Sequence, residues 1–116
     1  MADFQEDAGP VSHVGDHEGV LHNVKVHQLL KDRTYWCRDK LAIDKHGLNV
    51  MPRAKNAERW CFLGAMNKCY EEAELSRVTG QASEYIQRNT KYCCITDLND
   101  FGGYEQVINV AVALNI

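Results

Sequence analysis

The sequence predicts a mainly α-helical domain, a compact bundle of about four to five helices around a central helix at residues 57–72. Small side chains recur every four residues through this central segment while bulky apolar side chains fill its other side, so we expect neighbours on both sides of it. The composition, 45% hydrophobic and 25% charged, is typical of a globular domain. Short extended segments are predicted near 48–52 and 92–96, where proline or β-branched and aromatic residues disfavour helix.

The chain is predicted to comprise an acidic flexible arm at residues 1–15 and a single helical domain at residues 16–116. The first 24 residues carry a net charge of −5 and the remainder a charge of +2, so the total of −3 conceals an uneven distribution. The total composition does not reveal this acidic arm. We expect a partner to contact the chain where the arm joins the domain, at Asp16, His17 and Glu18.

The first helix is expected to begin after Asp16, which is a suitable N-cap, and to end near Lys31. The apolar residues between them follow helical spacing only in part, because Val24 and Val26 alternate as in a strand. A turn is predicted at residues 44–47, whose glycine can adopt a positive φ.

Asn56 is the expected N-cap of the central helix, and Gly64 within that helix should let one neighbouring segment approach closely. A further helix is predicted over about 75–86, where Gly80 weakens the helix and can divide it. The last helix is predicted over about 104–114, because its apolar residues recur at i, i+3, i+4 and i+7.

The turn before the last helix is the most function-like part of the sequence. Asp97, Asn99 and Asp100 are the predicted ligand-binding residues, since loops between rigid elements often carry sites. The alternative is that Asn99 and Asp100 make hydrogen bonds to the backbone and cap the last helix. No catalytic residue is predicted, because no acid, base and nucleophile set is assembled anywhere in the sequence.

The cysteines and histidines do not predict a metal site or a cofactor. There are five cysteines without any C-x-x-C spacing, which indicates reduced thiols that are mostly buried in the core. Cys61 in particular is expected to pack rather than to act as a nucleophile. The histidines near the N-terminus lack a His-Glu-x-x-His string and are expected to be solvated; they are His13, His17, His22 and His27.

Several function classes are disfavoured by charge and hydropathy patterning. Basic residues are interspersed with acidic ones and no recognition module is present, so direct nucleic-acid binding is not expected. No stretch has the length of about 18 apolar residues that a membrane span requires. The acidic N-terminus lacks the layout of a secretion signal, and free cysteines are typical of a reducing compartment, so a cytoplasmic location is predicted.

A series of motifs resembles a small helical family of bacteria and their phages that is known only as a domain of unknown function. The resemblance covers residues from about 18 to 116, and its most specific parts are a W-C-x-x-G-A string and an N-D-x-x-G string. Leu98 stands where that family usually has tryptophan. The resemblance implies a helical fold and a phage or mobile-element setting, and it implies no activity. The residues that carry it are Val20-Leu21, Leu29-Leu30, Trp36-Cys37 with Ala42, Asp44 and Gly47, Ala57 with Arg59 to Cys61, Gly64 and Ala65, and Asn99, Asp100 and Gly103 before Val107.

The leading hypothesis is a non-enzymatic binding protein, encoded by a phage or mobile element, that binds and inhibits a host protein or protein complex. An inhibitor of a bacterial defence system such as CRISPR is one concrete form. The alternative is a small-molecule sensor or small enzyme with a pocket near the Asn99-Asp100 turn, assisted by Cys37 or His46. A homo-oligomer is also compatible with the sequence, because the first predicted helix leaves apolar residues without intrachain partners.

Overall fold

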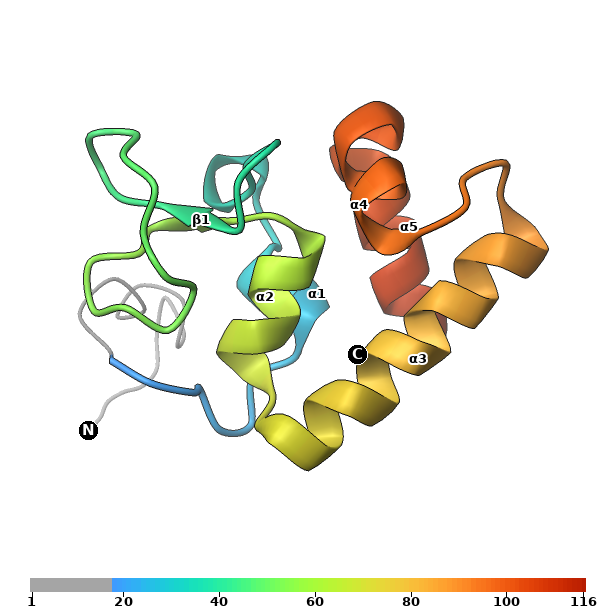
Figure 1. Cartoon of the computed structure of the whole chain (residues 1–116), viewed down its shortest axis with the longest axis horizontal. Helices are drawn as coiled ribbons and strands as arrows, with labels where there is room; N and C mark the ends of the chain where they lie inside the picture. Colours follow the sequence, from blue (N-terminus) through green and yellow to red (C-terminus); the bar gives the residue numbers. More distant parts are fainter. Residues whose placement is uncertain (1–17) are drawn as a thin grey trace.

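The computed structural model describes residues 18–116, and within them helices predominate (Figure 1). The predicted mainly α-helical class is therefore confirmed. The elements follow in this order: α1 (Val26–Leu29), the 3-10 helix η2 (Arg33–Tyr35), β1 (Ala42–Ile43), β2 (Arg59–Trp60), α2 (Phe62–Cys69), α3 (Glu72–Asn89), α4 (Ile95–Asp97), the π-helical turn η3 (Leu98–Gly102) and α5 (Tyr104–Leu114).

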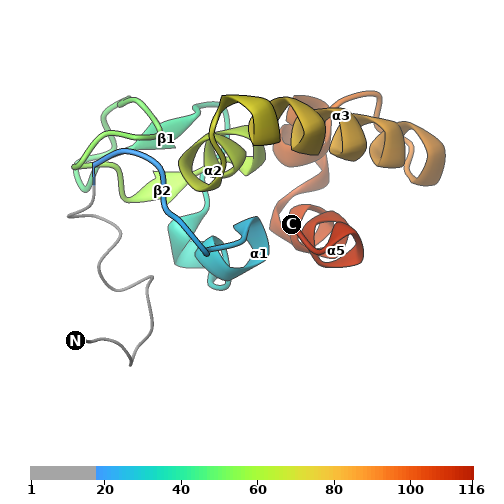
Figure 2. The ribbon, with the colours of Figure 1, turned by 90° about the horizontal axis from the view of Figure 1, so that it is seen from below.

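The helices are arranged in two layers around one core. Helices α2 and α3 form one layer and α1 and α5 form the other (Figure 2). The loop between β1 and β2 lies on the opposite side of α2 from α4 and α5 (Figure 1). The core contains buried side chains from every α-helix, and full burial of each large one contributes about 1.5–3 kcal/mol. Its largest members include Trp60, Phe62, Leu29, Met66, Ile86 and Leu98.

The central position of α2 was predicted, but its predicted start is wrong. The helix begins at Phe62 with Cys61 as N-cap, whose Sγ accepts a hydrogen bond of 3.3 Å from the Gly64 N–H. Residues 57–61 are not helical, and Arg59 and Trp60 within them form β2, which pairs antiparallel with β1. The Trp60 side chain is buried there and its indole N–H donates to the Pro52 carbonyl at 2.9 Å. Tertiary pairing thus overrides the local helical spacing.

The expectation that Gly64 allows a close approach is confirmed. A Cβ at this position would overlap the backbone carbonyl of Leu41, in the segment that leads into β1. The same carbonyl accepts a hydrogen bond of 3.2 Å from the Cys61 N–H at the start of α2. The missing side chain therefore brings the loop before β1 directly onto the helix.

The predicted first helix is wrong in extent. Only α1 is helical, and the chain before it has positive φ angles at Gly19 and Asn23, which interrupt a right-handed helix. This preceding segment runs along α2 instead, where the Leu21 N–H donates to the Lys68 carbonyl at 2.7 Å. Asp16, the expected N-cap, lies outside the described residues.

Of the later elements, the last helix and the turn at 44–47 agree with the sequence prediction, whereas the helix around Gly80 and the segment near 92–96 differ from it. Helix α3 continues through Gly80 without division, whereas α5 has the predicted bounds and the turn at 44–47 has Gly47 at φ 82°. Near 48–52 the backbone is extended where Asn49 pairs with Ile43. The segment near 92–96 was expected to be extended, but its last part belongs to α4 because Ile95 is anchored in the core.

Candidate functional site

Asn99 lies at the centre of a buried hydrogen-bond network. Its side chain is 1% exposed, because η3 places it against the start of α2. Its Oδ1 accepts hydrogen bonds from Trp36 Nε1 at 2.7 Å and from the Phe62 N–H at 2.9 Å. Its Nδ2 donates to the Cys37 carbonyl at 3.2 Å and to Asp100 Oδ1 at 2.9 Å. This amide therefore makes four hydrogen bonds within the protein, which is its full capacity for donors and for lone pairs.

Asp100 lies beside Asn99 and faces a small cavity. Its Oδ1 also accepts a hydrogen bond of 3.0 Å from the Asp39 N–H, which holds the loop before β1 against η3. The cavity has a volume of about 220 Å³, smaller than the 300–1,000 Å³ of usual small-molecule sites. It is lined by Asp39, Lys40, Leu41, Cys61, Leu63, Thr96, Asn99 and Asp100.

The three predicted ligand-binding residues do not all lie at this cavity. The structure brings Asn99 and Asp100 together at this cavity, while Asp97 is not among the residues that line it. The Asp97 carboxylate accepts a hydrogen bond from Cys93 Sγ instead. His46 is not among the lining residues either, and it belongs to the turn after β1.

The thiols near Asn99 are held in their protonated form. Burial raises the pKa of Cys61, and burial together with the neighbouring Cys61 raises the pKa of Cys37 to about 12. The thiolate is the nucleophilic form of cysteine, so neither group is activated at neutral pH. Cys37 Sγ donates to the Lys40 carbonyl at 3.4 Å, which suits a structural role.

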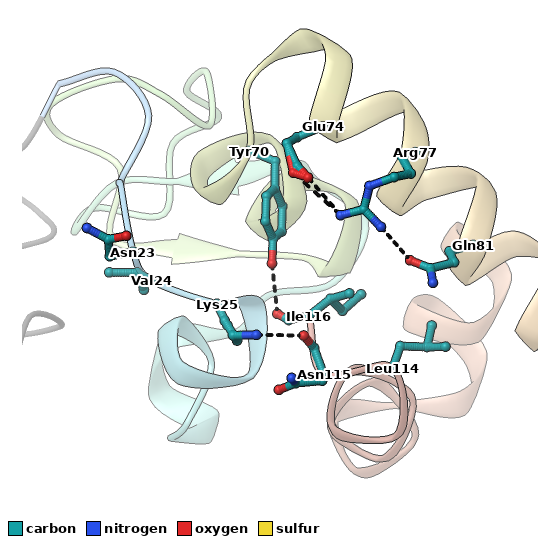
Figure 3. Close-up of a pocket in the computed structure, with 10 residues that line it drawn as sticks. All are labelled: Asn23, Val24, Lys25, Tyr70, Glu74, Arg77, Gln81, Leu114, Asn115 and Ile116. Carbon is teal, nitrogen blue, oxygen red and sulfur yellow. Dashed lines mark hydrogen bonds and ion pairs between the residues drawn. The ribbon is translucent and has the colours of Figure 1, made fainter.

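A second hollow, with a volume of about 510 Å³, lies between α3, the segment before α1 and the end of α5 (Figure 3). Its polar side chains bond to one another or to backbone carbonyls at the end of the chain. Arg77 contacts Glu74 at 2.7 Å and Gln81 at 3.2 Å, Lys25 Nζ donates to the Asn115 carbonyl at 3.0 Å, and the Tyr70 hydroxyl donates to the Ile116 carbonyl at 3.3 Å. The volume falls in the range of small-molecule sites.

The loop after β1 forms a second surface feature, which we call the tip loop (residues 44–51). The Asp44 carboxylate accepts hydrogen bonds from the His46 N–H at 2.8 Å and the Leu48 N–H at 2.9 Å, and these bonds lower its pKa below 3.8. Two backbone hydrogen bonds also close the loop, from the Asp44 N–H to the Leu48 carbonyl and from the Val50 N–H to the Ala42 carbonyl. The loop is therefore fixed, yet Leu48 is 63% exposed and Met51 is 72% exposed.

The predicted partner-contact residues fall mostly outside the described part of the chain. Asp16 and His17 lie outside it, while Glu18 is exposed at its first position. The next residue is tied to the domain, because the Gly19 carbonyl accepts a hydrogen bond of 2.9 Å from the buried Lys68 ammonium. The prediction for these three residues remains a prediction.

A cluster that sequence reasoning missed lies before and on α4. Cys93, Cys94 and Asp97 bring two thiols and a carboxylate together, with ligand atoms that all lie within 4.8 Å of one another. Cys93 is exposed and Cys94 partly exposed, unlike the other three cysteines. The signal was present as Cys-Cys-x-x-Asp, but zinc-ribbon spacing rules pass over adjacent cysteines.

Comparison of the chain with protein-family models, with curated proteins and with solved structures found no match. Among the described residues, no helix combines the length and the apolar character that crossing a bilayer requires.

Proposed function

We propose that this chain is a non-enzymatic binding protein that contacts a partner protein through the tip loop. The observation that carries the proposal is the combination of order and exposure in this loop. Its backbone is fixed by the Asp44 carboxylate, and it presents Leu48 and Met51 outward from the domain. Exposed apolar side chains on an ordered loop are the arrangement that a partner surface can bury.

The energetics of burial favour this interpretation. Covering the Leu48 and Met51 side chains on association contributes about 1.5–3 kcal/mol for each one that is fully buried. Because the loop is already ordered in the free protein, little conformational entropy is lost when a partner binds it. Affinity can therefore arise from a small contact area centred on two anchors.

Charge around the tip loop indicates the chemistry of the partner. Lys45 and Lys55 are exposed, while the one carboxylate of the loop, Asp44, is engaged by backbone N–H groups. Lys45 belongs to the tip loop and Lys55 follows it in the chain, so two exposed cationic side chains are available to a partner. We expect the partner to offer an apolar pocket bordered by acidic side chains, since complementary potentials favour encounter and orientation.

The biological setting that we propose is a phage or mobile element, and the partner a host protein or protein complex whose activity is inhibited, such as a component of a bacterial defence system. This part of the proposal is supported by the motif resemblance and by the small size of the domain. The Asn99 network adds support, because it uses for folding the polar groups that a catalytic site near the turn would need.

Affinity capture from a bacterial lysate with quantitative mass spectrometry tests the proposal. The wild type is compared with the Leu48→Ser/Met51→Ser double variant and with Val112→Ser, a control that removes an exposed apolar side chain of α5. We expect a stoichiometric partner that the double variant loses and the control retains. Capture that is equal for all three proteins would reject the tip loop as the contact surface.

A second candidate function is small-molecule binding in the hollow beside α3. The observation that favours it is the volume of about 510 Å³, lined by Lys25, Tyr70 and Arg77. Ligand-observed NMR with a library of small polar metabolites tests it, with Arg77→Ala as the variant. A ligand whose binding depends on Arg77 would support this function, and the absence of any binder would reject it.

A further inference from the structure

The Cys93, Cys94 and Asp97 cluster has the geometry of a chelating site. Cys93 Sγ lies 2.9 Å from Asp97 Oδ2, and the ligand atoms of all three residues lie within 4.8 Å of one another. All three residues come from one five-residue segment, so the local backbone alone brings their ligand atoms together. A tetrahedral zinc site has Zn–S distances of about 2.3 Å and Zn–O distances of about 2.0–2.2 Å.

The backbone that carries these side chains is fixed on both sides. Gln87 Nε2 on α3 donates to the Cys93 carbonyl at 3.2 Å, and the Leu98 N–H donates to the Cys94 carbonyl at 3.0 Å. Between them, Ile95 is buried in the core. The ligand groups are therefore preorganised by contacts that do not involve the thiols or the carboxylate, and these groups stay exposed to solvent.

We propose that Cys93, Cys94 and Asp97 bind a thiophilic divalent cation, Zn²⁺ in the first instance. Two thiolates and one carboxylate form a donor set of the kind that zinc accepts, and magnesium or calcium would instead require mainly oxygen ligands. Three protein ligands leave the fourth tetrahedral position open, as in zinc sites that bind a water or an external group. The site goes beyond the proposed contact at the tip loop and does not depend on it.

Binding is an exchange of protons for metal bonds and involves no oxidation. Each thiol loses its S–H proton to solvent as a Zn–S bond forms, and the Asp97 carboxylate, which accepts a hydrogen bond from Cys93 in the free protein, becomes a ligand through oxygen. The Thr96 hydroxyl lowers the pKa of Cys94, whereas the Asp97 contact raises the pKa of Cys93 to about 11.

Titration of the reduced, metal-free full chain with Co²⁺ tests the proposal, because thiolate–cobalt charge-transfer absorption reports sulfur ligands and the visible bands report tetrahedral geometry. Competition with Zn²⁺ in the presence of a chromophoric chelator gives the zinc affinity. The variants are Cys93→Ser, Cys94→Ser, the double variant and Asp97→Asn. Glu84→Gln, which alters an exposed carboxylate on α3, is the control.

We expect about one Co²⁺ per chain, displaced by Zn²⁺, with an absorption that each cysteine variant loses. The double variant should bind Zn²⁺ more than about 100-fold more weakly, beyond what loss of an outer partner of a ligand costs. The control should match the wild type. Because the double variant retains the buried thiols Cys37, Cys61 and Cys69, metal binding that persists in it, or no stoichiometric binding by the wild type, would overturn the proposal.

Discussion

Trp36 Nε1 donates a hydrogen bond of 2.7 Å to Asn99 Oδ1, a residue 63 positions later in the chain. The same oxygen accepts the Phe62 N–H, one of the N–H groups that the start of a helix leaves without a helical partner. One amide side chain thus joins the segment after η2, the first turn of α2 and η3. This geometry makes Asn99 a structural junction whose loss should be felt by the whole domain.

We predict that Asn99→Ala lowers the free energy of unfolding by about 2–4 kcal/mol, because the buried Phe62 N–H and the partly buried Trp36 indole N–H each lose their acceptor at about 1–3 kcal/mol. Urea unfolding followed by circular dichroism measures this change. Asn109→Ala, at an exposed position of α5, is the control and should change stability by less than about 0.5 kcal/mol. Equal effects of the two substitutions would contradict the assigned role.

Two glycines on helices should respond oppositely to alanine. Gly64→Ala forces a Cβ into the Leu41 carbonyl and should cost about 1–3 kcal/mol or more. Gly80→Ala meets nothing within 4 Å on α3 and should stabilise the protein by about 0.5–1 kcal/mol. Thermal unfolding of both variants measures the difference, and stabilisation by Gly64→Ala would show that the close approach to Leu41 is absent in solution.

The order of the tip loop should depend on ionised Asp44. The pKa of Asp44 is lowered below 3.8, chiefly because the Leu48 N–H donates a hydrogen bond to the charged carboxylate. The stabilisation of the loop by this carboxylate is therefore present above that value and is lost as the pH falls through the lowered pKa. Asp44→Ala should remove it at any pH. Amide hydrogen exchange of His46 and Leu48 measures the effect, with Lys45→Ala as control. Unchanged protection in Asp44→Ala would show that other bonds order the loop.

The thiols should divide into reactive and unreactive groups. Burial raises the pKa of Cys69 to about 12, and burial together with the neighbouring Cys61 raises the pKa of Cys37 to about 12. These two residues therefore hold almost no thiolate at pH 8. Cys94 is partly exposed with a lowered pKa and should react first with an aromatic disulfide reagent. Stopped-flow absorbance of the wild type and Cys94→Ser measures the fast phase, which the variant should lose. Fast modification of Cys69 in the folded protein would contradict its burial.

Local patterns were sufficient to predict the parts of the fold that local chemistry decides. Helix α5 has an uninterrupted helical stripe, and the turn at Gly47 has the conformation that its glycine allows. The start of α2 could not be predicted in this way, because Ala57 and Trp60 have helical spacing yet lie in a segment that pairs with β1. Long-range strand pairing is invisible to periodicity within one segment.

In the candidate sites, too, residue types could be recognised from the sequence, whereas features that depend on long-range contacts could not. The Asn99-Asp100 turn was recognised from its residue types. The burial of Asn99, however, arises from contacts with Phe62 and Cys37, which lie far from it along the chain and which a local sequence pattern does not contain. Leu48 and Met51 look like ordinary strand residues in the sequence, and only the ordered loop reveals their exposure. The thiol cluster depends on how α4 turns Asp97 back toward Cys93.

Photo-crosslinking in bacterial cells tests directly whether the tip loop is the contact surface for a partner protein. A photoreactive phenylalanine analogue is placed at position 48 in one variant and at position 112 in the control, both of which are exposed. We expect a single dominant crosslinked protein at position 48 that is absent at position 112 and is lost on competition with the untagged wild type. Equal crosslinking at both positions, or none at position 48, would contradict it.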